Sequence, residues 1–394
     1  EKMSKYIYMD NAATTPVKEE VLKEMMPYFT EKYGNPSSVY SLASKSKVVV
    51  ENAREQVANA IGADKKEIFF TAGGSESDNW AIKGAAYSNR KKGNHIITTK
   101  IEHHAVLHTC EYLEKQGFEI TYLNVDEDGL ISLEELKDSI KDDTILISIM
   151  FANNEIGTIQ PIREIGEIAK ERNILFHTDA VQAIGNIRID VKELNIDLLS
   201  MSAHKFHGPK GIGALYIRQG VKIDSLIAGG GQERGRRAGT ENVPGIVGMG
   251  KAIELAYSNF EEHNKKLITL RDSLIEKIEN NIKYVRLNGH RTKRLPGNVN
   301  FCFEFIEGES LLLSLDMVGI AASSGSACTS GALDPSHVLM AIGLPHEIAH
   351  GSLRLTLGEF NTEEEVDYVV ENLVTIVERL RNMSPLYEKV KGEN

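Results

Sequence analysis

Cysteine is scarce in this sequence, and it has neither long apolar runs nor an excess of positive charge. Its 394 residues include three cysteines, Cys110, Cys302 and Cys328, an odd and sparse set that fits a reducing compartment better than a disulfide framework. The apolar runs are shorter than the roughly 20 residues of a transmembrane helix. The N-terminal segment lacks the apolar region of a signal peptide. We therefore expect a cytoplasmic protein with no membrane partner.

The charge balance is acidic. Lys and Arg total 45 against 56 Asp and Glu, which gives a formal net charge of −11. Nucleic acids and anionic membranes are bound through basic patches, so neither is expected as the main partner. The chain is longer than a single ordinary core requires, and we expect two domains.

The three cysteines differ in their surroundings. Cys110 lies in a helical pattern and Cys302 in a strand-like one, and both are expected to be small buried hydrophobic residues. Cys328 lies in a loop of small residues, where a thiol can be exposed and reactive. Composition alone leaves a structural and a nucleophilic role for Cys328 equally open.

Polar side chains directly follow two short apolar runs, 174–176 and 198–201. Asp179 and Gln182 close the first run, and Ser202, His204 and Lys205 close the second. Open α/β sheets bind ligands at the carboxyl ends of their strands, so these residues predict a pocket there. A lysine amine can form a Schiff base with an aldehyde, and a buried carboxylate can keep a pyridinium protonated, which is the chemistry of pyridoxal phosphate (PLP).

An isolated Asp and Lys would more often be a satisfied carboxylate and a surface amine, but the surrounding motif is specific. HTDAVQ followed by SMSAHKFHGPKG resembles the cofactor core of the fold-type I PLP enzymes of the class-V aminotransferase family. It is most similar to the NifS/IscS-type cysteine desulfurases, and the similarity extends from Met9 to about Tyr387. The resemblance implies that Lys205 bonds to PLP, Asp179 pairs with the pyridine nitrogen and Gln182 donates to the phenolate oxygen. It also implies that Ser202 and His204 lie on the phosphate side.

Two further blocks match the family's cofactor site. The expected strand 68–71 runs into a glycine turn and a helix, whose N-terminus attracts a phosphate; the resemblance implies that Gly74 and Ser75 belong to the phosphate cup. By itself, His103 at a helix start would be a capping or surface residue. The resemblance implies that it stacks on the cofactor ring and transfers protons, for which a near-neutral pKa suits histidine.

Substrate-binding residues are expected from two other segments. Asn154 follows the expected strand 144–150, and the resemblance implies contacts with cofactor and substrate carboxylate. Arg354 interrupts the apolar strand expected at 350–358, and arginine is suited to bidentate carboxylate recognition. The resemblance implies that Arg354 holds the α-carboxylate of L-cysteine.

A glycine-rich loop at 228–240 contains three arginines. Without context it would be a solvated basic turn. It resembles the family's GGGxERGxRxGT block, which implies that Thr240 reaches the cofactor phosphate of a neighbouring subunit and that the protein is a homodimer.

The loop SSGSACTSG at 323–331 resembles the signature of the first group of cysteine desulfurases. The resemblance implies that Cys328, in a loop of about residues 321–333, takes the sulfur as a persulfide. The catalytic residues are then Cys328, Lys205 and His103.

The expected fold class is α/β, a fold-type I PLP-dependent transferase. We expect a large domain at 15–257, with a mostly parallel seven-stranded sheet between helices. A smaller α+β domain would comprise 1–14 and 258–394.

The expected function is PLP-dependent conversion of L-cysteine to L-alanine, with the sulfur passed from Cys328 to an acceptor protein. That acceptor would be a scaffold for iron–sulfur clusters or a thiolation enzyme. Selenocysteine lyase or aminotransferase-like activity is the alternative, although a transaminase needs no loop thiol. A non-catalytic sulfur-relay partner would not need the complete set of Lys205, Asp179, His103 and Arg354.

Residues 124–135 fit the spacing of a calcium-binding loop. The preceding residues 118–123 alternate like a strand, whereas such a loop needs a helix there. We expect a turn followed by a helix that begins with a capping box of Ser132 and Glu135, and no metal site.

Overall fold

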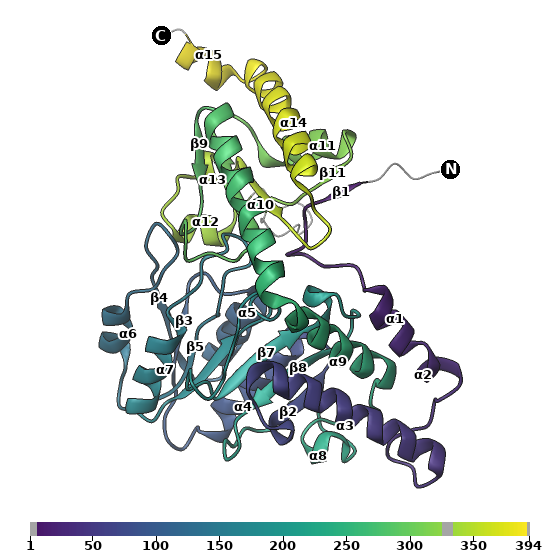
Figure 1. Ribbon diagram of the computed structural model, residues 1–394. Helices are drawn as coiled ribbons and strands as arrows, with labels where there is room; N and C mark the ends of the chain where they lie inside the picture. Colours follow the sequence, from purple (N-terminus) through teal and green to yellow (C-terminus); the bar gives the residue numbers. More distant parts are fainter. Residues whose placement is uncertain (1–5, 325–333, 392–394) are drawn as a thin grey trace.

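A seven-stranded sheet forms the centre of the larger part of the molecule (Figure 1). The computed structural model describes residues 6–324 and 334–391, and within these ranges the strand order is β2-β8-β7-β6-β5-β3-β4. β8 runs antiparallel to both of its neighbours, and the other adjacent pairs are parallel. The strands are β2 (Ile68–Thr71), β3 (His95–Thr99), β4 (Glu119–Leu123), β5 (Thr144–Ser148), β6 (Leu175–Asp179), β7 (Leu198–Ser202) and β8 (Gly213–Ile217). The predicted mostly parallel sheet is confirmed.

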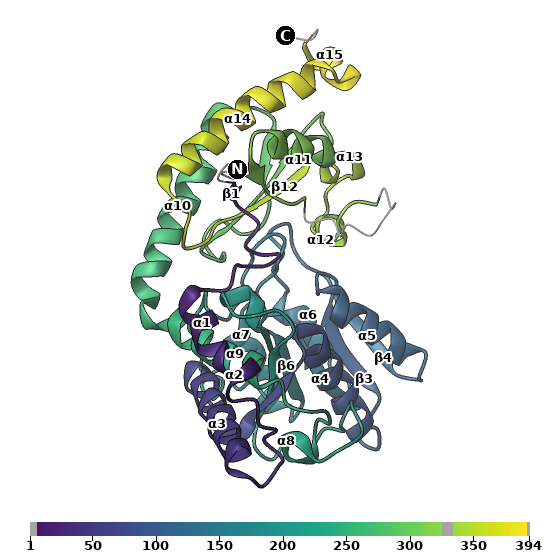
Figure 2. The ribbon, with the colours of Figure 1, turned by 90° about the vertical axis from the view of Figure 1, so that its right-hand side faces the viewer.

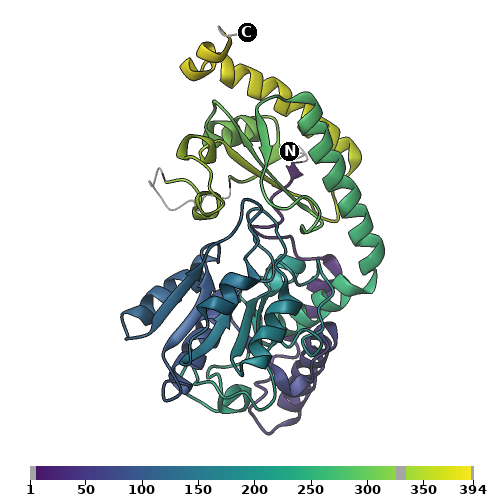
Figure 3. The ribbon, with the colours of Figure 1, turned by 90° about the vertical axis from the view of Figure 1, so that its left-hand side faces the viewer.

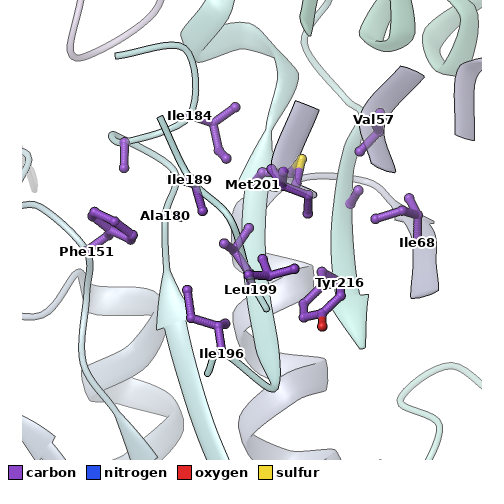
Figure 4. Close-up of a cluster of buried hydrophobic side chains, with 14 of the residues drawn as sticks. Val57, Ile68, Phe151, Ala180, Ile184, Ile189, Ile196, Leu199, Met201 and Tyr216 are labelled. Carbon is purple, nitrogen blue, oxygen red and sulfur yellow. The ribbon is translucent and has the colours of Figure 1, made fainter. Parts of the chain in front are cut away.

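Helices cover both faces of this sheet. Side chains alternate along a strand, so Ile68 and Phe70 of β2 join the core on one face and Phe69 joins the core on the other. Figure 4 shows part of the first core, with Val57 of a covering helix and Met201 of β7 among the labelled side chains. The first face is covered by α3 (Ser41–Ile61), α6 (Leu133–Ser139), α7 (Ile162–Glu171) and α9 (Val243–Ser258), and the second by α4 (Gly74–Ser88) and α5 (His104–Glu114).

Short elements complete the larger part. α1 and α2 pack against α9, and two 3₁₀ turns flank the sheet. These elements are α1 (Glu19–Met25), α2 (Pro27–Thr30), α8 (Gln232–Gly235) and the 3₁₀ turns Lys65–Glu67 and Ala203–Phe206.

The C-terminal part has a sheet and a core of its own. Strands β12, β10 and β9 form an antiparallel sheet, and β1 pairs in parallel with β11. This core takes in Met9 from the N-terminal segment, which crosses to the C-terminal part in Figures 1 and 2. Its elements are β1 (Ile7–Tyr8), α10 (Phe260–Asn281), β9 (Val285–Leu287), β10 (Asn298–Phe303), α11 (Gly308–Met317), β11 (Ile320–Ala321), α12 (His337–Ala341), α13 (His346–Ala349), β12 (Ser352–Thr356), α14 (Glu363–Asn382) and α15 (Pro385–Lys391).

Two successive helices, α9 and α10, join the two parts of the molecule. α9 ends at Ser258, Asn259 leaves the helical region with φ −122° and ψ 39°, and α10 begins at Phe260. α9 contributes to the core of the large sheet and α10 to the C-terminal core. Figure 3 shows α10, in green, running along the edge of the molecule from one part to the other. We propose that the large and small domains divide at this break.

Three other expectations can be compared with the structure. β4 precedes the turn at 124–131, as predicted, and Ser132 Oγ accepts from the amide of Glu135 at 3.2 Å. The second half of the capping box is wrong, because the Glu135 carboxylate accepts instead from the backbone and side-chain nitrogens of Asn124, both at 3.1 Å.

Cys110 and Cys302 are fully buried, as predicted. None of the helices in the described ranges is long and apolar enough to cross a membrane.

Candidate active site

The carboxyl ends of three neighbouring strands carry most of the polar residues singled out in the sequence. β6 ends in Asp179, and the parallel strand β7 ends in Ser202, with Asp179 opposite Ser200. β7 continues into the 3₁₀ turn that holds His204 and Lys205. Asn154 follows β5, which pairs with β6 on its other side. The predicted pocket edge is therefore present, and the small domain lies over it (Figure 2).

Lys205 points its amine at the N-terminal segment. Nζ donates to the carbonyl oxygen of Ala12 and, at 2.9 Å, to that of Ala13, while Gln182 Nε2 donates to the same Ala12 oxygen at 3.0 Å. Burial, followed by the charge of Arg354, lowers the pKa of Lys205 to about 8. Lys205 and Gln182 line a cavity of about 620 Å³ between the two domains. The structure thus brings these two predicted residues together.

Asp179 lies over a buried polar cluster. Its carboxylate is 6% exposed and accepts from the amide of Val181 at 3.0 Å. Beneath it, His177 Nδ1 lies 2.7 Å from Ser148 Oγ and Nε2 lies 2.9 Å from Ser200 Oγ. Burial lowers the pKa of His177 to about 4, so its ring is neutral at pH 7. The neutral His177 ring therefore brings no positive charge to this cluster.

The N-terminus of α4 meets the ends of β6 and β7. A methyl group at Gly74 would lie 2.8 Å from Val181 Cγ2, and one at Gly73 would lie 3.8 Å from Ser202 Oγ. Ser75, in the first turn of α4, is exposed. His204 Nδ1 lies 3.0 Å from Thr14 Oγ1, and burial lowers the pKa of His204 to about 4. A 15-residue helix that begins with glycines and a free hydroxyl is a favourable place for an anionic phosphate.

Arg354 reaches from β12 of the small domain to this edge. Nη1 donates to the backbone carbonyl of Asn154 at 3.0 Å, and Nη2 lies 3.1 Å from Oδ1 of Asp10. Among the described residues Nε of Arg354 has no hydrogen-bond partner, although it is buried. Arg354 and Asn154 are brought together as the sequence suggested, through the backbone of Asn154.

His103 is the N-cap of α5. Its Nδ1 accepts from the amide of Ala105 at 3.0 Å, and its side chain is exposed. The preceding Glu102 is fully buried within reach of the charge of Asp179, and burial raises the pKa of Glu102 to about 8. The start of α5 thus lies beside the Asp179 cluster.

Two predicted residues are less closely tied to this edge. Thr240 is exposed in the glycine-rich loop, and the nearby Arg237 forms a two-bond ion pair with Glu76 of α4 at 2.8 and 3.1 Å. Cys328 lies outside the described residues. On one side of its segment, Ser323 pairs with the backbone of Arg354, and Ser352 Oγ donates to the carbonyl of Ser324 at 2.8 Å.

The other side of the Cys328 segment is also tied to the site. Ser336 Oγ donates to Glu155, and His337 Nε2 lies 2.9 Å from the carbonyl oxygen of Glu102. Burial raises the pKa of Glu155 to about 7. Both flanking stretches therefore lie against residues next to Arg354, Asn154 and His103.

Several groups at the site had no role predicted from the sequence. Asp10 and the backbone carbonyls of Ala12 and Ala13 belong to the polar N-terminal segment. Asp78 and His177 lie at positions that face the sheet interior, where a titratable residue on an otherwise apolar face is a detectable signal.

The residues present fit PLP. The Lys205 amine can bond to its aldehyde, the Asp179 carboxylate can pair with its ring nitrogen, and the side-chain-free surface of Gly74 leaves room at the helix N-terminus for its phosphate. The unpartnered Nε of Arg354 leaves binding capacity for a carboxylate. Fold and site together define a fold-type I PLP enzyme.

Comparison with known proteins agrees with this class. The family model described as "Aminotransferase class-V" matches residues 7–369. The cysteine desulfurase IscS of Clostridium botulinum is 66% identical over 388 residues, which cover 98% of each chain. A solved structure titled "NIFS-LIKE PROTEIN" is 44% identical with a TM-score of 0.90, covering 95% of this chain and all of that one. "SspA in complex with cysteine" is 41% identical with a TM-score of 0.81, covering 90% of this chain and all of that one.

The chain therefore belongs to the class-V aminotransferase family and, within it, to the cysteine desulfurases of the NifS/IscS type. Its cofactor is PLP.

Proposed function

We propose that this protein is a cysteine desulfurase that converts L-cysteine to L-alanine and retains the sulfur as a persulfide on Cys328. The strongest support is that Lys205, Asp179 and Arg354 lie within reach of one another at one edge of the sheet, and that a stretch flanking the Cys328 segment pairs with Arg354. The similarity to the Clostridium botulinum enzyme and to a cysteine complex supports the same substrate.

The cofactor would be held by residues from both sides of the sheet edge. Lys205 would bond to it, Asp179 would pair with its ring nitrogen, and Gln182 would donate to its phenolate oxygen. Gly74, Ser75, Ser202 and His204 would surround its phosphate. PLP withdraws electrons from the α-carbon of a bound amino acid, so the α-proton becomes acidic. A pKa of about 8 lets Lys205 exchange protons near neutral pH, since its neutral form is within reach.

Substrate binding and sulfur transfer would use a second group of residues. Arg354 would bind the α-carboxylate with Asn154 beside it, and His103 would move protons through the ring nitrogen that does not accept from Ala105. The Cys328 thiolate would attack the substrate sulfur: an S–S bond forms, the C–S bond breaks and its electron pair stays on carbon, which takes up a proton. The balance is L-cysteine plus the Cys328 thiol giving L-alanine plus the Cys328 persulfide.

We further propose a homodimer in which Thr240 completes the neighbouring subunit's phosphate site. Large exposed apolar patches mark protein interfaces. Exposed apolar side chains gather within residues 22–48, which include α1, α2, the loop after α2 and the first half of α3. They are Leu22, Met26, Phe29, Tyr33, Val39, Tyr40 and Val48. In sedimentation, Phe29→Glu with Val39→Glu is expected to yield monomers that lose PLP, and a PLP-bound monomer would contradict the shared site.

The persulfide would pass to an acceptor protein, a scaffold for iron–sulfur clusters or a thiolation enzyme, in the cytoplasm. The acidic net charge does not favour nucleic acid as that partner.

Alanine release from L-cysteine in the presence of a thiol reductant tests the activity. Wild-type protein is expected to release alanine, and Cys328→Ser is expected to release almost none while keeping its PLP absorbance. Cys110→Ala is the matched control, because that thiol is buried in α5 and should be dispensable. Equal alanine from wild type and Cys328→Ser would refute persulfide transfer through Cys328.

A further inference from the structure

A second acidic residue is buried next to Asp179. Asp78 lies on the face of α4 that packs on the sheet, between Ser77 and Trp80, and is 1% exposed. Its Oδ1 lies 3.5 Å from His177 Nε2 and, within the described part of the chain, has no hydrogen-bond partner. The mechanism above does not use Asp78.

Among the residues that the structure describes, none of the groups that act on Asp78 is a cation. His177 on β6 has both ring nitrogens occupied by hydroxyl groups, Ser148 of β5 and Ser200 of β7, and is neutral at pH 7. The other titratable groups that act on Asp78 are the carboxyls of Asp179 and Glu102. A buried, unpaired carboxylate is so unfavourable that the group takes up a proton instead. Burial, followed by the charge of Asp179, accordingly raises the pKa of Asp78 well above its usual range.

A protonated carboxyl has one O–H donor, and an ionised carboxyl has none. The Asp78 carboxyl lies within hydrogen-bond reach of two side chains, the carboxyl of Asp179 and the hydroxyl of Ser200, and of these an ionised Asp179 supplies no donor. Because Asp179 is the more exposed of the two, at 6% against 1%, and also accepts from the amide of Val181, the negative charge is better placed on Asp179. The proton then lies on Asp78.

We propose that Asp78 is a positioning residue, which stays protonated and donates a hydrogen bond to Asp179, so that Asp179 is held ionised and oriented toward the ring nitrogen of the cofactor. This role rests on the proposed PLP site and adds to it, because it assigns to Asp78 the proton that the two acids could share. A neutral donor favours the ionised form of its acceptor, whereas a second carboxylate would oppose it. His177 is hydrogen-bonded to Ser148 and Ser200, and in this position it lies beside the Asp78 carboxyl.

Two substitutions of Asp78 test whether its role is to donate a hydrogen bond to Asp179 or to carry a charge. Asp78→Asn is neutral and retains an N–H donor of nearly the same shape, so its dissociation constant for PLP is expected to stay within about threefold of wild type. Asp78→Ala removes the donor, and loss of a hydrogen bond to a charged group should weaken PLP binding roughly 10- to 100-fold. The constant is measured by titrating cofactor-free protein with PLP and following absorbance. Ser77→Ala is the matched control, since it removes two buried hydrogen bonds of α4, to Thr71 and to the carbonyl of Ala214, that do not involve Asp179.

Asp78→Asn binding PLP as weakly as Asp78→Ala would overturn the proposal, and so would unchanged binding by Asp78→Ala. Should Asp78→Ala fail to fold, infrared difference spectra of wild type against Asp78→Asn give a second test. The C=O band of a protonated carboxyl at pH 7 is expected to be lost in Asp78→Asn; Glu102 contributes equally to both proteins. No lost band would mean that Asp78 is ionised, which overturns the proposal. Neither measurement uses turnover, so a protein that passes both and releases no alanine would contradict the proposed function alone.

Discussion

A buried ion pair anchors the glycine-rich loop to the large sheet. Arg54 Nη1 lies 2.7 Å from Glu233 Oε2 and Nη2 lies 2.9 Å from Oε1, with both side chains almost fully buried. Oε2 also accepts from the amide of Phe70 at 3.0 Å. Glu233 has φ +47°, a backbone conformation that non-glycine residues adopt infrequently. These bonds therefore hold the loop that leads to Thr240 in place.

Glu233→Gln is expected to lower the free energy of unfolding by roughly 3 kcal/mol, because it leaves the buried Arg54 with the half-exposed carboxylate of Glu51, 3.1 Å from Nε, as its remaining counter-ion. The glutamine oxygen can still accept from Phe70 and from Arg54 Nη1, but its amide nitrogen would face Arg54 Nη2, so the loss combines the missing charge with one missing hydrogen bond. Adding Arg54→Met removes the stranded cation, and the double variant should recover much of that loss. The carbonyl of Ile68, which Arg54 also contacts, keeps a second donor in Arg234 at 3.1 Å.

Urea unfolding at fixed protein concentration, followed by circular dichroism, measures this double-mutant cycle. Glu261→Gln is the control, since its partner Arg188 lies 2.7 Å away at the surface and such a pair contributes about 0–1 kcal/mol. A loss below about 1 kcal/mol for Glu233→Gln, or strictly additive losses in the double variant, would refute the reasoning about the buried charge.

Three further predictions concern the site. In cofactor-free protein, Lys205→Met should raise the free energy of unfolding by up to about 3 kcal/mol below pH 8, because the pKa of the amine falls from 10.5 in the unfolded chain to about 8 in the fold. This gain should vanish as the pH approaches 10.5. A gain in thermal unfolding that does not depend on pH would contradict the prediction. Arg354→Lys should raise KM for L-cysteine roughly 10- to 100-fold with a smaller change in kcat; steady-state kinetics with unchanged KM would oppose the carboxylate role. Gly74→Ala should weaken PLP binding roughly 5- to 100-fold through overpacking against Val181, and Val181→Ala should restore it; titration showing no rescue would exclude that contact.

The fold was largely predictable because its elements are marked locally. Strands were expected at 68–71 and 144–150, and the structure has β2 and β5 there. The break at Asn259 between α9 and α10 leaves no local mark, since no proline or glycine lies there and the two helices pack on different cores. The capping box at Ser132 failed for a similar reason: a residue eight positions earlier, Asn124, competes for the Glu135 carboxylate.

The candidate site divides in the same way. Asp179, Ser202 and Lys205 could be assigned to one edge because they follow two apolar runs directly in the chain. The contact of Arg354 with Asp10 spans 344 positions, and the carbonyls of Ala12 and Ala13 meet Lys205 across more than 190. Such pairs leave no local signal.

The sequence by itself determined the chemical groups and their order, since a lysine, a carboxylate, a glycine turn and a loop thiol are properties of residues and short motifs. Only the tertiary structure decided their charge states and their partners. The pKa of Lys205 is lowered and those of Asp78, Glu102 and Glu155 are raised mainly by burial, which depends on how α4, α5 and the small domain close over the sheet edge. Burial is a property of the packed chain, so no stretch of sequence contains it.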